Sequence, residues 1–163
     1  MRRTLGFVLL AGLAGIVTGC FTKENKPPEP VVNGRPPADK ERTLEYWSKV
    51  RDVMRQKTSS NDMQAVATVV RQQAETVRRL PIDGVDYELY VGAIAVAQFQ
   101  EKLLKAAETA GYSPASLRAD PTLRKTYTDA CQQVATATAD LKALHTKLST
   151  RYGVLFPPIE DQQ

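Results

Sequence analysis

A seven-residue repeat of apolar residues in the C-terminal part of the chain constrains the fold more than any other feature. Its members follow one another at alternating steps of four and three between residues 121 and 152: Leu123, Tyr127, Ala130, Val134, Ala137, Leu141, Leu144 and Leu148. Because an α-helix has about 3.6 residues per turn, this spacing places them all on one face. A face of this kind packs against neighbouring helices at a shallow angle of about 20°. The sequence therefore predicts a long helix over residues 121–152 with its apolar side against other helices.

The same three-and-four spacing extends back to Asp39 and predicts three more helices, over residues 39–57, 61–80 and 83–110. The first presents Leu44, Trp47, Val50 and Met54, with Tyr46 and Val53 beside them, and the second presents Met63, Val66, Val70, Val77 and Leu80. Ser113 and Pro114 predict a short helical turn before the last helix. We expect an all-α fold, an antiparallel four-helix bundle over residues 39–156. A repeat of two helix pairs is the alternative.

The third predicted helix contains a stretch that is apolar on every side. From residue 91 to residue 97 each position is apolar or glycine. A helix with no polar face in its middle is buried on more than one side. Two interpretations follow: this helix lies centrally among the others, or its additional face contacts another protein.

The first twenty residues have the order of a secretory signal. Arg2 and Arg3 precede an apolar run over residues 5–17, and Thr18-Gly19-Cys20 follows. The apolar run is shorter than the roughly 20 residues that a permanent membrane-spanning helix needs. We therefore expect residues 1–19 to be a signal peptide that is removed.

Val17-Thr18-Gly19-Cys20 resembles the lipobox of bacterial lipoprotein precursors, in which an aliphatic residue and small residues precede the acylated cysteine. The resemblance is confined to the leader. It implies cleavage before Cys20, a diacylglycerol on the Cys20 sulfur and membrane attachment through the acyl chains, because two or three chains hold a protein firmly. An ordinary signal peptide, or a short anchor, that ends in cysteine is the alternative.

The residue after the acylated cysteine bears on localisation. In lipoproteins of the enteric type an aspartate there retains the protein in the inner membrane, and this chain has Phe21. The resemblance thus implies the outer membrane, with the domain facing the periplasm.

A proline-rich stretch separates the leader from the predicted helices. Half of the ten prolines lie in it, at positions 27, 28, 30, 36 and 37. Proline favours extended backbone at about 3.1 Å per residue. We expect residues 20–38 to be a tether, and residues 157–163, with Pro157-Pro158 and two acidic residues, to be a frayed tail.

Composition and charge exclude several functions. A chain of 163 residues has room for one domain. The net charge of +4 includes Arg2 and Arg3, so the part after the leader is close to neutral, and no basic stripe suggests nucleic-acid binding. His145 is the sole histidine, which excludes multi-histidine metal sites. Cys131 and His145 lie about 21 Å apart along one predicted helix, too far to act as a catalytic pair. The sequence predicts no enzyme and no cofactor.

One ligand-carrying alternative has residues to support it. Soluble cytochromes of the b562 type hold haem between a methionine of the first helix and a histidine of the last, and Met54 and His145 are of those types. Antiparallel helices would place these two residues at different levels. The second hypothesis is nevertheless a helical core that carries haem or an apolar small molecule.

The first hypothesis is a lipid-anchored, non-enzymatic helical module that binds an envelope protein or associates with itself. Its expected surface combines small residues of the third and last predicted helices, which would let another helix approach closely. These residues are Gly92, Ala95, Thr136, Ala139 and Ala143.

Overall fold

The computed structural model describes residues 37–159, and in that range the chain forms helices and no strands. The helices are α1 (Lys40–Met54), α2 (Met63–Arg79), α3 (Tyr87–Thr109), the short α4 (Pro114–Ala119) and α5 (Pro121–Tyr152). All of the expected long helices are present, and α4 is the helical turn predicted after Ser113. The prediction of an all-α fold is confirmed for this range.

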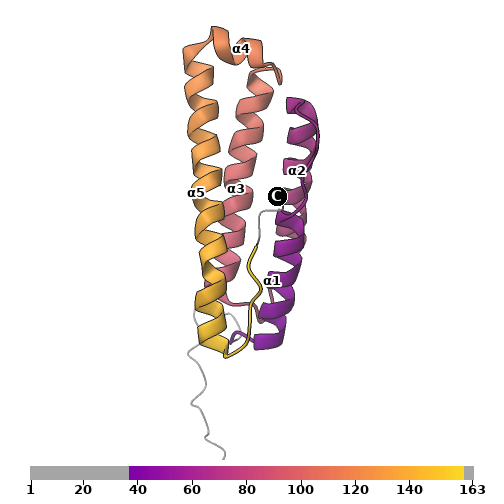
Figure 1. Cartoon of the computed structure of the whole chain (residues 1–163), viewed down its shortest axis with the longest axis vertical. Helices are drawn as coiled ribbons and strands as arrows, with labels where there is room; N and C mark the ends of the chain where they lie inside the picture. Colours follow the sequence, from indigo (N-terminus) through magenta and orange to yellow (C-terminus); the bar gives the residue numbers. More distant parts are fainter. Residues whose placement is uncertain (1–36, 160–163) are drawn as a thin grey trace, which may run out of the picture.

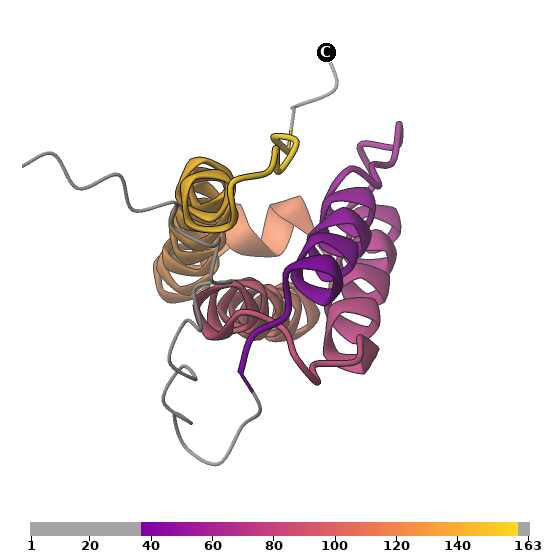
Figure 2. The same ribbon diagram turned by 90° about the horizontal axis from the view of Figure 1, so that it is seen from below.

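The long helices lie side by side and alternate in direction along the chain, as Figure 1 shows. The most extensive packing joins α3 to α5 and α2 to α3, while α1 rests on α2 and α3. Seen end-on, α5 and the α1–α2 pair lie on two sides of α3 (Figure 2). Within the apolar stretch Ala93, Val96 and Ala97 are buried, whereas Val91 is 43% exposed, so one side of the stretch is not covered by the other helices.

Side-chain oxygens fix where the helices begin. Asp39, Asp62, Asp86, Ser113 and Asp120 each accept a hydrogen bond from a backbone N–H in the first turn of the helix that follows. The second and third helices thus begin later than the predicted residues 61 and 83, because the aspartates at 62 and 86 supply the caps. Gly153 ends α5 in the left-handed conformation with φ of 64°.

The apolar repeat of α5 faces the interior along its whole length. Ala130, Ala137, Leu141 and Leu148 are buried, and the other members are half-buried. Trp47 on α1 is fully buried, as predicted. On α2 the predicted face is partly wrong: Val66 is 40% exposed, and Ala67, Gln73 and Ala74 are buried with Val77. Ala67 and Ala74 thus occupy the buried face of α2, and Val66 lies outside it.

The chain after α5 does not fray as predicted. Residues 153–159, here called the C-terminal strap, fold back between α5 and α1 (Figure 2). Phe156 is fully buried and Ile159 is 6% exposed. The indole N–H of Trp47 donates to the carbonyl oxygen of Pro157 at 2.7 Å. The predicted tail is therefore part of the core as far as residue 159.

A buried carboxylate joins three helices beside the strap. Asp86, 4% exposed, caps α3 through Oδ1, while its Oδ2 accepts hydrogen bonds from Arg151 at 2.5 Å and Tyr152 at 2.9 Å. Its own N–H donates to Oγ1 of Thr43 on α1. Burial acts to raise the pKa of Asp86, but the hydrogen bonds from Arg151, Tyr152 and the Leu89 N–H outweigh it and lower that pKa. Asp86 is thus ionised in the folded protein and ties α1, α3 and α5 together.

Candidate functional site

A groove runs along the line where α3 packs on α5. It consists of two hollows that share Gln133, and we call it the α3–α5 groove. The hollow nearer α4 has a volume of about 500 Å³ and the next one about 450 Å³. Their apolar and small lining residues are Val91, Gly92, Ala95, Phe99, Ala106, Leu123, Ala130 and Ala137.

The groove lies on the side of α3 that faces away from α2. Gln100 donates to Gln73 of α2 at 2.9 Å, and Glu101 pairs with Arg78 of α2. Lys102 and Ala106 project from other sides of the helix and line the groove instead. The helices α1 and α2 cover the opposite side of α3. They therefore do not cover the groove, which is open to solvent.

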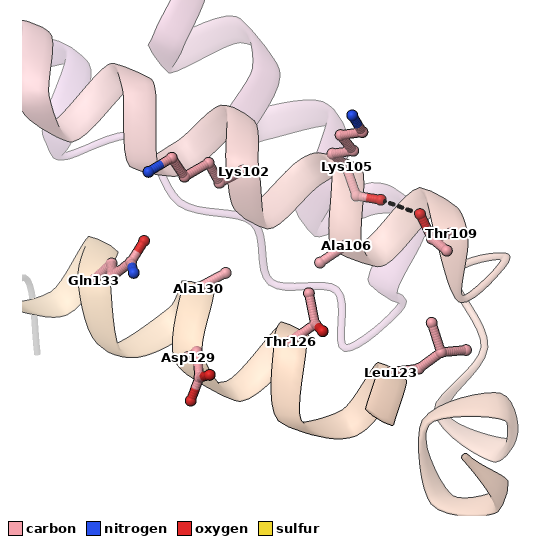
Figure 3. A pocket seen from close by; sticks show the side chains of 9 residues that line it. All are labelled: Lys102, Lys105, Ala106, Thr109, Leu123, Thr126, Asp129, Ala130 and Gln133. Carbon is pink, nitrogen blue, oxygen red and sulfur yellow. Dashed lines mark hydrogen bonds between the residues drawn. The ribbon is translucent and has the colours of Figure 1, made fainter. Parts of the chain in front are cut away.

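Figure 3 shows how the hollow nearer α4 is built. Ala106 on α3 and Thr126 and Ala130 on α5 point between the two helices and form its floor. Lys105 points away from α5, and Asp129 points away from α3. The groove thus has a floor of small side chains, a basic rim on α3 and an acidic residue on the α5 rim.

The two helices approach each other closely beside Gly92. A Cβ atom placed on Gly92 would lie 3.2 Å from Cδ1 of Leu144 and 3.5 Å from Cδ1 of Leu141. The missing side chain therefore lets the leucines of α5 reach the backbone of α3. In this part of the groove, Val91 is 43% exposed although it is apolar.

The structure brings together three of the five residues predicted to form an interaction surface. Gly92, Ala95 and Thr136 line the same hollow. Ala143 lines a shallow hollow further along α5, which shares Asp140 with the groove. Ala139 is exposed on α5 and lines none of these hollows. Cys20, the predicted lipidation site, lies outside the described residues.

The residues considered for catalysis or haem binding have local partners. Nδ1 of His145 lies 2.8 Å from the carbonyl oxygen of Lys142, and Nε2 lies 3.2 Å from Oγ1 of Thr146. Met54 is the last residue of α1 and packs on the core. Burial raises the pKa of the Cys131 thiol, although a hydrogen bond with Tyr127 opposes the shift. A thiol with a raised pKa is a poor nucleophile.

Residues 37–159 contain no group of three or more histidine, cysteine or acidic side chains arranged to hold a metal ion. None of the helices in this range has the length and apolar character to span a membrane.

The polar residues that hold the helices together were not predicted as a group. Gln73 on α2 donates from Nε2 to the carbonyl oxygens of Val53 and Gln56 at the end of α1, and its Oε1 accepts from Gln100. Asp86 and Arg151 form the second such group. A buried position for Gln73 could have been inferred from its place between Val70 and Val77. Its partners depend on contacts between distant parts of the chain.

Comparison with known proteins gives no relative from which a function could be transferred. No protein family matches the sequence, and neither a curated protein nor a solved structure matches the chain.

Proposed function

We propose that this chain is a lipid-anchored protein of the bacterial envelope whose helical domain binds a helix of another polypeptide in the α3–α5 groove. In this proposal the four long helices form an antiparallel four-helix bundle, and the domain carries out no catalysis. Cys20 anchors it in the outer membrane, and residues 20–38 act as a spacer. The observation that carries the docking proposal is an open groove of small side chains between two long helices.

The shape of the groove fits a helix better than a small molecule. It runs parallel to α3 and α5 through two consecutive hollows and is open along its length. Small residues such as Ala95 and Thr136 allow a third helix to approach closely, and the gap between two packed helices accepts the side-chain ridge of another. Val91 adds apolar area that a partner would remove from water.

The ligand-carrying alternative has less support. A haem or an apolar molecule is usually enclosed, with 70–90% or more of its surface buried. The α3–α5 groove is an open surface feature, and both ring nitrogens of His145 are engaged within α5.

The anchor is tested by labelling cells that express the full chain with radioactive palmitate. We expect label in the protein, loss of that label in Cys20→Ser, and accumulation of the uncleaved precursor. Phe21→Asp tests whether the anchor lies in the outer membrane. This substitution should move the protein toward the inner-membrane fraction. An unlabelled wild-type protein that stays in the soluble fraction would refute the anchor.

The groove is tested separately with a photo-crosslinking amino acid placed at Thr136, in the full chain in intact cells. The control position is Gln72, which is exposed on α2. We expect a discrete protein adduct from position 136 that is absent from position 72. Equal crosslinking from the two positions, or none from either, would contradict docking in the groove.

A further inference from the structure

The charges on the two rims of the α3–α5 groove are of opposite sign. Lys102 and Lys105 line it from α3, and Asp129 lines it from α5. Asp129 already pairs with Lys125 in its own helix at 2.5 Å, but the two side chains are 53% and 76% exposed. Exposed pairs of this kind contribute little, so the Asp129 carboxylate is available to another cation.

We propose that the partner is a second copy of the same chain, whose α3–α5 face packs against this face across a two-fold axis parallel to the helices, so that side chains of the partner's α3 and α5 cover the groove. This inference rests on the proposed function, since it names the partner of the same groove. Rotation about such an axis places α3 of one copy over α5 of the other. The basic rim of each copy then meets the acidic residue of its partner.

The levels of the charged residues along the helices favour this axis. Figure 3 shows Lys102 level with Asp129, with Lys105 one turn further toward α4. A two-fold axis parallel to the helices leaves the levels unchanged, so Lys102 of one copy faces Asp129 of the other, and the reciprocal pair forms by symmetry. An axis across the helices would stack α3 on α3 and bring like charges closer, which is unfavourable.

The same rotation brings apolar and small residues together further along the face. Val91 on α3 and Asp140 on α5 line the same hollow, and Ala143 lies one turn beyond Asp140. Val91 of one copy is thereby placed near Ala143 of the other. Tyr87, one turn before Val91, is 52% exposed. The contact thus has apolar area toward the start of α3 and charge pairs toward α4.

Disulfide formation between two differently tagged full-length chains tests the arrangement. One chain carries Lys102→Cys and the other Asp129→Cys. Both also carry Cys131→Ala, so that the introduced cysteine and Cys20 are the only cysteines in each chain, and any disulfide through Cys20 contributes equally to every sample. Membranes from cells that make both chains are oxidised and the tags are detected. Because each chain has one introduced cysteine, a mixed dimer reports a contact between copies. Arg79→Cys, at a position on α2 that is 80% exposed, replaces Lys102→Cys in the control.

We expect a mixed dimer of the Lys102→Cys and Asp129→Cys chains that exceeds the dimers formed by either chain alone and by the Arg79→Cys control. Equal yields in all samples would overturn the proposal, and so would a predominant Lys102→Cys homodimer, which indicates the crosswise axis. If Thr136 gives a photo-adduct with a different protein and no mixed dimer forms, the partner is not a second copy of this chain. That result would still support docking in the groove. Absence of both products removes the groove as a docking site.

Discussion

The two ends of α5 are packed differently, although one apolar repeat runs through both. Toward Gly153 the repeat buries Leu141 and Leu148 beside Trp47 and Phe156. Toward α4 its one buried member is Ala130, while Leu123 and Tyr127 are half-buried. We call these the strap end and the α4 end. The strap end has additional covering elements, and the α4 end has α3 and a six-residue helix with no buried residue.

This difference divides one helix pair into a part that stabilises the fold and a part with less buried apolar area. Large side chains, the strap and the Asp86 hydrogen bonds hold the strap end in one arrangement. Small buried residues such as Ala130 bury little apolar area at the α4 end, and one hollow of the α3–α5 groove lies there. Regions with few buried apolar contacts open at lower free energy, and binding surfaces are often found in them.

The largest expected effect comes from truncating the same residue type at the two ends. Leu148→Ala should lower the free energy of unfolding by about 2–5 kcal/mol, because it removes a fully buried side chain and leaves a cavity. Leu123→Ala should cost about 1 kcal/mol, since Leu123 is half-buried. Urea denaturation followed by circular dichroism measures both. Equal costs would show that the two ends are packed alike.

The next comparison uses two aspartates that both cap a helix. Asp86→Ala should cost about 2–4 kcal/mol, because it removes a cap, the acceptor of the Tyr152 hydroxyl and one of the two carboxylates that pair with Arg151. Asp120→Ala removes only a cap, at about 1 kcal/mol. The same denaturation experiment gives the values. If Asp120→Ala is the more costly of the two, the Asp86 network does not stabilise the strap end as described.

A third comparison adds a side chain at Gly92, where α3 and α5 lie close together. Gly92→Leu adds a side chain where the first new carbon already lies 3.2 Å from Leu144. It should destabilise the protein by about 1–3 kcal/mol through overpacking. Ala139→Leu, at an exposed position of α5, is the matched control and should change stability by about 0.5 kcal/mol or less. A neutral Gly92→Leu would mean that the helices are less closely packed there.

The pH dependence of stability gives the smallest expected effect. The pKa of Asp86 is lower in the folded protein than the value of about 4 expected when unfolded. Its ionised form therefore adds stability above about pH 4, and this contribution is lost as the pH falls through the lowered pKa. The stability difference between wild type and Asp86→Asn should shrink on going from pH 6 to pH 2.5. A difference that stays constant over this range would contradict a lowered pKa.

The sequence was sufficient to predict the helices and the inward face of α5, because both depend on local spacing. It was also sufficient to place Trp47 on the apolar face of α1, where it is fully buried. It failed at Val66, because large apolar residues were expected inside, whereas Ala67 and Ala74 occupy the buried face. It failed at the strap, where Pro157-Pro158 indicated a frayed end. Phe156 and Ile159 were the available signal, but their burial depends on Trp47, more than 100 residues away.

The candidate site was predicted in part. Gly92, Ala95 and Thr136 were chosen as small residues on two helices, and they line one hollow because the repeat sets the register of α5 on α3. The basic and acidic rims at the α4 end were not predicted. Charged residues occur along every helix of this chain, and only the packing shows that Lys102 and Asp129 lie on opposite edges of one groove.

Hydrogen exchange measured along α5 in the full-length protein tests the central claim most directly. We expect the amides of residues 121–136 to exchange through openings of lower free energy than those of residues 138–152, because the strap, Trp47 and the Asp86 network cover only the second segment. Protection that is uniform along α5, or stronger toward α4, would contradict the division into a stable strap end and a more open α4 end.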